Sequence, residues 1–91
     1  MPRTLIVKRY TGDNRADERV SCRLSGRITF NGVFITDCVI KDMSVSGFRA
    51  FIESDTWLPN EFEVECKHFD SPIRARVRWR SKELLGAEYV F

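Results

Sequence analysis

Residues 73–80 alternate strictly between apolar and cationic side chains, and this pattern restricts the fold more than any other feature of the chain. The apolar positions are Ile73, Ala75, Val77 and Trp79, and each position between them is an arginine. Successive side chains of a β-strand point to opposite faces, so a period of two places each set on its own face. We therefore expect a half-buried strand here, with Trp79 among the inward side chains.

The same period recurs along the chain, and no window shows an apolar pattern of helical period. Strands are predicted over Val20–Phe30, Val33–Ile40, Phe48–Ile52, Glu61–Lys67, Ile73–Arg80 and Leu85–Phe91. An Asn-Gly pair, Asn31 and Gly32, separates the first two, and both residues tolerate the positive φ of a two-residue hairpin turn. The prediction is an all-β chain that folds into a six-stranded antiparallel barrel with little helix.

The length of 91 residues fits one domain. Residues 1–14 hold a single short apolar run, Leu5-Ile6-Val7, and are expected to form a flexible N-terminal arm before a domain over residues 15–91. The chain shows neither a signal-peptide pattern nor the ~20 apolar residues of a spanning helix. We therefore expect a cytoplasmic protein without membrane insertion, and a monomer rather than a dimer.

Charge and cysteine content argue against several classes of function. The formal net charge is +2, from 15 Lys and Arg against 13 Asp and Glu, which is too balanced for a protein that coats duplex DNA. The three cysteines, Cys22, Cys38 and Cys66, form no C-x-x-C pair and are expected to be buried, reduced side chains without a metal. No Ser or Cys has a histidine partner suited to nucleophilic catalysis, so we expect neither an enzyme nor a cofactor.

Two polar motifs are not explained by the barrel. The first is Arg15-x-x-x-Arg19, just before the first strand, and the second is Asp42-x-Ser44-x-x-Gly47, between two strands. Guanidinium groups suit phosphate diesters and the O6 and N7 acceptors of guanine. A carboxylate accepts hydrogen bonds from the N1 and N2 hydrogens on the other edge of guanine. Together the motifs favour a guanine-containing ligand.

In this order and strand context the two motifs resemble the paired signature of PilZ domains. The resemblance covers roughly residues 14–91 and extends to positions outside the motifs. These are Leu58-Pro59, Val77-Arg78-Trp79 and Gly86. It implies a PilZ-type barrel that binds the bacterial second messenger cyclic di-GMP.

The resemblance also implies a role for each motif residue. Arg15 and Arg19 would bind the phosphates and guanine edges of the ligand. Asp42 and Ser44 would hold a guanine against the barrel wall, and Gly47 would give the ligand clearance. The resemblance also leaves open a position of Trp79 near the ligand, where it could stack on a base. The arm would fold over the ligand, and the protein would signal to a partner protein of a motility, biofilm or exopolysaccharide system.

The same residues are compatible with different functions. The chain could be a nucleotide-independent PilZ-like adaptor between proteins, and the second motif could be an ordinary turn. The arginines of residues 73–80 invite a nucleic-acid hypothesis. However, a hairpin that places Glu65, Glu63 and Glu61 opposite Arg76, Arg78 and Arg80 would account for them by cross-strand ion pairs. Binding of single-stranded nucleic acid is the least favoured, because most aromatic residues fall on positions expected to face inward.

Overall fold

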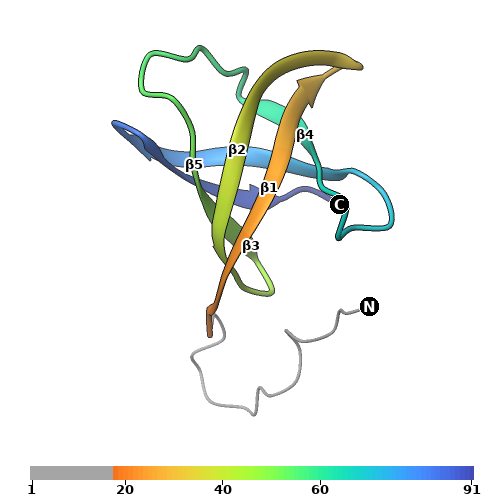
Figure 1. The fold of residues 1–91 in the computed structure, drawn as a ribbon, viewed down its shortest axis with the longest axis vertical. Helices are drawn as coiled ribbons and strands as arrows, with labels where there is room; N and C mark the ends of the chain where they lie inside the picture. Colours follow the sequence, from red (N-terminus) through yellow and green to blue (C-terminus); the bar gives the residue numbers. More distant parts are fainter. Residues whose placement is uncertain (1–17) are drawn as a thin grey trace.

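The computed structural model describes residues 18–91, which form six β-strands and no helix. The strands are β1 (Val20–Phe30), β2 (Val33–Met43), β3 (Gly47–Phe51), β4 (Glu61–Glu65), β5 (Ile73–Ser81) and β6 (Leu84–Tyr89). They close into an antiparallel barrel in the order β1-β2-β3-β6-β5-β4 (Figure 1). The predicted all-β barrel of six strands is therefore confirmed. The expected arm, residues 1–14, lies outside the described residues.

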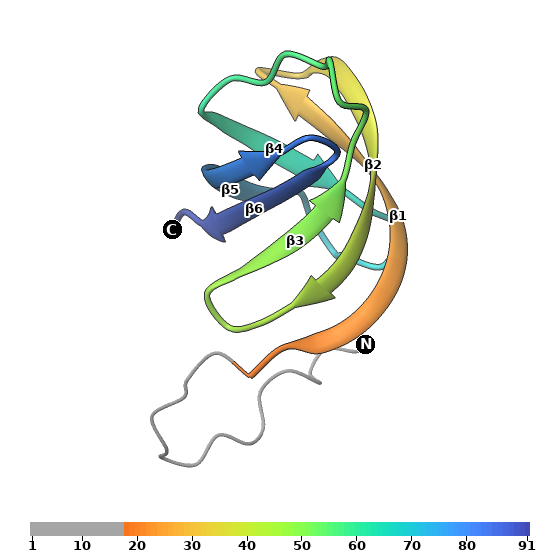
Figure 2. The same cartoon turned by 90° about the vertical axis from the view of Figure 1, so that its left-hand side faces the viewer.

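A long hairpin of β1 and β2 forms one wall of the barrel. Its turn has the predicted conformation, with φ of 53° at Asn31 and 81° at Gly32. Two residues of positive φ give the turn a twist that matches the flanking strands. At the opposite end of this hairpin, the turn from β2 to β3 lies beside the beginning of β1 (Figures 1 and 2). The fold thus brings the ends of both motif regions to one end of the barrel.

All six strands contribute side chains to one apolar core. The core residues with almost no exposed surface are Ile28, Ile40, Phe48, Ala50, Phe62, Val64, Ala75 and Leu85. Burial of a large apolar side chain contributes about 1.5–3 kcal/mol. The described residues form no helix that could add a second packed layer, so this core provides the main stabilisation of the barrel. No described segment is a helix of the length and apolarity that a bilayer span requires.

The predicted pairing of β4 with β5 is wrong by four residues. Glu63 lies opposite Arg74, and Glu61 lies opposite Arg76 rather than Arg80. The strand β4 ends at Glu65, and the connection to β5 begins with a turn in which the N–H of Phe69 donates to the carbonyl of Cys66. Phe69 packs against the core, which needs a longer connection than the tight hairpin that was predicted.

The arginines of β5 nevertheless have partners within the fold. Arg76 forms ion pairs with Glu61 at 2.9 Å and with Glu88 at 3.1 Å, and Arg78 reaches Glu88 at 3.2 Å. Arg80 donates hydrogen bonds to backbone carbonyls of the connection from β3 to β4, the shortest to Thr56 at 2.6 Å. These contacts account for three cations of β5 without a bound nucleic acid.

The prediction that most aromatic residues face inward is also wrong. Six large aromatic side chains are substantially exposed: Phe30, Phe34, Phe51, Trp57, Trp79 and Phe91. Two of them lie under cations, with Arg27 5.0 Å from the ring centre of Phe34 and Lys41 5.4 Å from that of Phe51. The argument from aromatic burial against nucleic-acid binding therefore fails. The balanced net charge and the partners of the β5 arginines still argue against that function.

Candidate functional site

A β-bulge turns the carboxylate of Asp42 away from the core. Ile40 faces the core opposite Ala50, and strict alternation would point Asp42 inward as well. The pairing of β2 with β3 is irregular between these two positions, and Asp42 lies opposite Arg49 instead. An extra residue in one strand re-aims the side chains that follow it. Asp42 consequently lies on the outer face of the barrel.

Asp42 lies between two arginines that cover it. Arg19 Nε is 2.8 Å from Oδ1, and Arg49 approaches Oδ2 with Nη2 at 2.7 Å and Nε at 2.9 Å. The carboxylate side chain is only 5% exposed, whereas the arginine side chains are 34% and 38% exposed. The hydrogen bonds from both arginines to Asp42 are charge-assisted, and the arginine side chains remain in contact with solvent.

The pKa values follow from this arrangement. Burial alone would raise the pKa of Asp42, but hydrogen bonds from Arg49 and Arg19 outweigh burial and lower it below the ordinary value. The hydrogen bond to Asp42 raises the pKa of Arg49 in turn. Asp42 is therefore ionised at neutral pH and holds both guanidinium groups in place.

Arg49 was not predicted as a site residue. It follows the motif residue Gly47 by two positions and lies between the core residues Phe48 and Ala50. That spacing alone indicates an outward side chain. Its contact with Asp42 depends on the bulge in β2, which the sequence pattern does not reveal.

Ser44 lies inside the turn that joins β2 to β3. Its Oγ accepts hydrogen bonds from the N–H of Ser46 at 3.2 Å and of Gly47 at 3.3 Å. Its own N–H donates to the carbonyl of Gly47 at 2.8 Å, and the residue is 1% exposed. The hydroxyl therefore stabilises the turn that leads into β3, which agrees with the interpretation of this motif as an ordinary turn.

Gly47 is required by the close approach of β3 to β6. A Cβ at this position would lie 2.9 Å from the Cα of Glu88 and closer still to the carbonyl oxygen of Ala87. Both neighbours are backbone atoms, which cannot move aside as a side chain can. Packing of the barrel thus accounts for this glycine, whatever clearance it also gives to a ligand.

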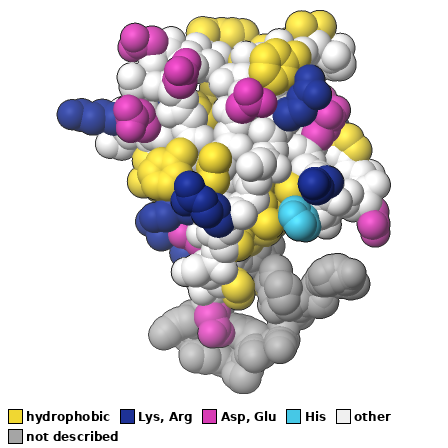
Figure 3. Space-filling model, viewed as in Figure 1, with side chains coloured by type: hydrophobic (Ala, Val, Ile, Leu, Met, Phe, Trp, Pro, Cys, Tyr) yellow, Lys and Arg dark blue, Asp and Glu magenta, His cyan; other side chains and the backbone are white. Residues whose placement is uncertain are grey.

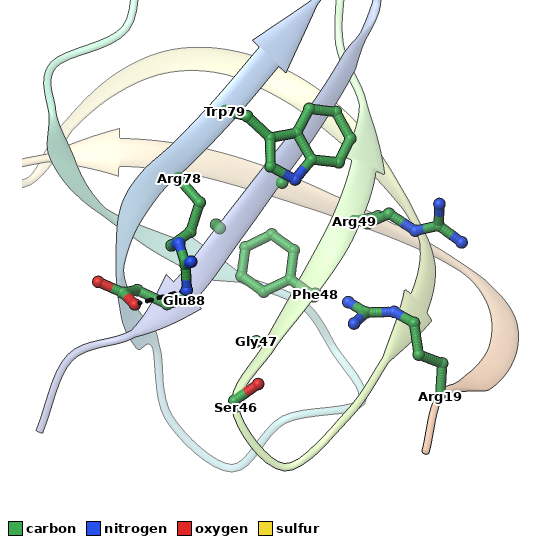
Figure 4. A pocket seen from close by; sticks show the side chains of 10 residues that line it. Arg19, Ser46, Gly47, Phe48, Arg49, Arg78, Trp79 and Glu88 are labelled. Atoms are coloured by element: carbon green, nitrogen blue, oxygen red, sulfur yellow. Dashed lines mark hydrogen bonds and ion pairs between the residues drawn. The ribbon is translucent and has the colours of Figure 1, made fainter. Parts of the chain in front are cut away.

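The prediction that Trp79 points inward is wrong. The pairing of β5 with β6 is irregular between Val77 and Trp79, which places Trp79 opposite Gly86. The indole lies on the outer surface against the backbone of Gly86 and is 42% exposed (Figure 4). The alternation of residues 73–80 is thus interrupted by a second bulge.

The side chains of Arg19, Arg49 and Trp79 border a pocket of about 380 Å³ on the outer face of the barrel. Figure 4 shows Arg19 and Arg49 on one side of it and Trp79 and Arg78 on the others. The lining residues are Arg19, Ser46, Gly47, Phe48, Arg49, Arg78, Trp79, Gly86, Ala87 and Glu88. The pocket combines guanidinium donors with an exposed aromatic face, which suits an anion that carries an aromatic base.

The structure brings most of the predicted site residues together. Arg19 and Gly47 line the pocket. Asp42 does not line it but forms an ion pair with Arg19, and Ser44 stabilises the adjoining turn by hydrogen bonds. Arg15, the other arginine of its motif, lies outside the described residues.

Among residues 18–91 no group of His, Cys, Asp and Glu side chains has the arrangement of a metal site. All three cysteines are free thiols, of which Cys38 is buried. Burial is the main cause that raises the pKa of Cys38 to about 12 and also raises the pKa of Cys22. Because thiolates are the nucleophilic and metal-binding form, a raised pKa makes these two thiols less reactive than an ordinary thiol at neutral pH.

Comparison with known families gives one match. A family model described as PilZ domain matches residues 13–91, nearly the whole chain. None of the curated proteins compared with the chain matches it.

Proposed function

Since the chain belongs to the PilZ domain family, a family of cyclic di-GMP receptors, we propose that it binds cyclic di-GMP in the pocket on the outer face of its barrel. The observation that carries the proposal is the position of Asp42, which holds Arg19 and Arg49 at the rim of a pocket bordered by Trp79. The ligand is a dianion with two guanines, and the pocket offers guanidinium groups for phosphates or guanine edges and one exposed indole face for stacking.

The arginines have donors left for a ligand. Arg19 uses only its Nε for Asp42, and no other residue of the described part of the chain binds its two Nη groups. Arg49 uses Nε and Nη2 and keeps Nη1. Guanidinium donors of this kind bind phosphate oxygens or the O6 and N7 edge of guanine. Arg15 would supply the second arginine of its motif.

Asp42 acts mainly through the arginines in this proposal. Its carboxylate is almost fully covered, and both oxygens already accept hydrogen bonds. To accept from the N1 and N2 hydrogens of guanine, it would have to exchange one guanidinium contact for the base. Trp79 offers an exposed indole face on which a guanine can stack.

Binding, not catalysis, is the function that this arrangement supports. PilZ domains are binding and adaptor domains, and the pocket presents donors and an aromatic face rather than a nucleophile with a base. We propose that the ligand changes the position of the segment that precedes Arg19 and thereby alters contact with a partner protein in the cytoplasm. Motility, biofilm and exopolysaccharide systems are the processes that such an adaptor would serve.

The alternative is a nucleotide-independent adaptor, and one observation favours it. The motif residues Asp42, Ser44 and Gly47 each have a structural role without any ligand, as an ion-pair centre, a turn residue and a packing glycine. A barrel could therefore retain them for stability alone.

A fluorescence titration separates the two functions. The chain has two tryptophans, Trp57 and Trp79, and Trp57 is an exposed residue that does not line the pocket. The variant W57F leaves the indole of Trp79 as the sole tryptophan signal. We expect a saturable change in its emission with cyclic di-GMP and none with cyclic di-AMP or GMP. An unchanged emission, together with no heat of binding, would favour the adaptor.

A further inference from the structure

β1 is longer than its neighbour β4, and part of its edge is therefore unpaired within residues 18–91. β1 pairs with β2 from Val20 to Phe30, with irregularities between Ser21 and Leu24 and between Ile28 and Thr29. β4 pairs only with residues 27–29 of β1. On the side away from β2, no described strand is paired with residues 20–26, although Gly26 at the end of this stretch still lies close to Glu65 of β4. The backbone groups along such an edge can receive an additional strand.

The edge of β5 that extends beyond β4 is covered by other residues, in contrast to the edge of β1. β5 also extends beyond its pairing with β4, which ends at Arg76. There the N–H of Val77 donates to the carbonyl of Asn60 at 2.9 Å, and Arg80 binds carbonyls of the connection from β3 to β4. That connection covers the edge of β5, whereas the described residues supply no equivalent for β1.

The side chains beside the free edge have a definite chemistry. The inward residues Cys22 and Leu24 are half-buried and pack against the rim of the core. On the face shown in Figure 3, apolar side chains reach the surface beside the lower part of β1. An added strand with apolar side chains at matching positions would extend the core there.

The outward face of this stretch is cationic. Arg23 is exposed, no acidic side chain among residues 18–91 forms an ion pair with it, and β1 contains no acidic residue. Beside the point where β1 and β4 diverge, a pocket of about 490 Å³ is lined by two cations, Arg27 and Lys67, and by two acidic residues, Asp37 and Glu65. The charge that this stretch offers to a partner is therefore that of Arg23. Opposite charges on neighbouring strands stabilise their pairing.

We propose that the edge formed by residues 20–26 is a docking site for an extended acidic segment of a partner protein, which adds a strand beside β1. Its carboxylates would face Arg23, and its alternate apolar side chains would cover Cys22 and Leu24. Backbone hydrogen bonds would supply affinity, and this alternation would supply specificity. The proposal does not depend on nucleotide binding.

A second copy of the chain fits the edge less well. In a two-fold arrangement centred on this stretch, β1 of one molecule would lie antiparallel to β1 of the other. Arg23 would then face Arg23 of the second copy, and like charges opposite each other destabilise a strand pair. The same arginine that attracts an acidic strand thus disfavours self-association.

The test uses the whole protein without nucleotide. The probe is a labelled peptide in which glutamate alternates with valine, and its length equals that of residues 20–26. We expect saturable binding in fluorescence anisotropy, and slower amide exchange in residues 20–26 but not in β5. A lysine–valine peptide should bind at least about five times more weakly, because the cross-strand charge pairs become repulsive. A peptide with the same side chains but N-methylated backbone amides should not bind.

Two variants of the protein complete the test. R23E should weaken binding of the glutamate–valine peptide about five- to tenfold and strengthen binding of the lysine–valine peptide. The control K82E makes the same change in charge in the turn between β5 and β6 and should leave both affinities unchanged. Equal binding of the two peptides, or binding that survives N-methylation, would overturn the proposal. A dimer that protects residues 20–26 without any peptide would overturn it as well.

Discussion

The indole ring of Trp79 lies so close to Gly86 that this position has no room for a side chain. A Cβ at Gly86 would stand 2.7 Å from Cζ2 of Trp79 and closer still to Nε1 and Cε2. Trp79 is thereby held against the outer surface of β6, where its exposed face borders the pocket. The pair thus fixes one wall of the candidate site from outside the core.

The first prediction follows from this contact. G86A should destabilise the barrel by about 1–3 kcal/mol, because the new methyl group overlaps the indole. It should also change the emission of Trp79 in a W57F background. In the double variant G86A/W79A the cost of the methyl group should largely disappear, since the overlapping ring is absent. Chemical unfolding of the four proteins measures this coupling. Equal costs of G86A with and without Trp79 would contradict the contact.

The second prediction concerns Asp42 and pH. D42N should destabilise the protein by about 1–3 kcal/mol at neutral pH, because both arginines lose a charged partner. The folded-state pKa of Asp42 is lower than its unfolded value of about 3.9, so its contribution is complete above that pH and is lost as the pH falls through the folded pKa.

The measurement is the free energy of unfolding of wild type and D42N between pH 2 and pH 8. Asparagine does not titrate, so the difference between the two proteins should be constant above about pH 5 and shrink below about pH 4. A difference that stays constant over the whole range would show that the ion pairs of Asp42 do not stabilise the fold.

The third prediction separates packing from ligand contact at Gly47. G47A should destabilise the protein by about 3 kcal/mol or more, because its methyl group would meet backbone atoms of β6. G26A is a matched control, since a Cβ there would lie 3.0 Å from a carbonyl oxygen of Glu65 and 3.3 Å from Sγ of Cys38. It should cost less. If thermal unfolding shows G47A to be as stable as wild type, β3 and β6 do not approach as closely as described.

The fourth prediction tests Arg49, the residue that motif analysis missed. Lysine keeps the charge at this position but cannot bind Asp42 and a ligand with a planar group of several donors. R49K should therefore weaken cyclic di-GMP binding about tenfold, equivalent to about 1.4 kcal/mol. R74K, on an exposed arginine of β5 outside the pocket, should bind as wild type. Equal affinities of R49K and R74K would exclude Arg49 from the site.

Much of the fold could be predicted from the sequence because the apolar period and the turn residues carry that information. The six strands, the Asn-Gly turn and the antiparallel barrel all follow from local patterns, and the family model supports the resemblance on which the site was predicted. A period of two is set by the geometry of each strand alone, so it needs no knowledge of the neighbouring strands.

What could not be predicted depends on pairing between strands. The bulges before Asp42 and before Trp79 reverse the face on which these side chains lie, and neither is marked by a glycine or a proline within the strand. The inward prediction for Trp79 and the omission of Arg49 have this single cause. The wrong pairing of β4 with β5 arose because Phe69, in the connection, packs on the core.

The most direct test of the proposed function is a calorimetric titration of the folded protein with cyclic di-GMP, with cyclic di-AMP and GMP as controls. We predict saturable heat with cyclic di-GMP alone, and its loss in R19A, which removes a guanidinium from the rim of the pocket. A protein that is shown to be folded and yet gives no heat with cyclic di-GMP would contradict the receptor function and leave the nucleotide-independent adaptor.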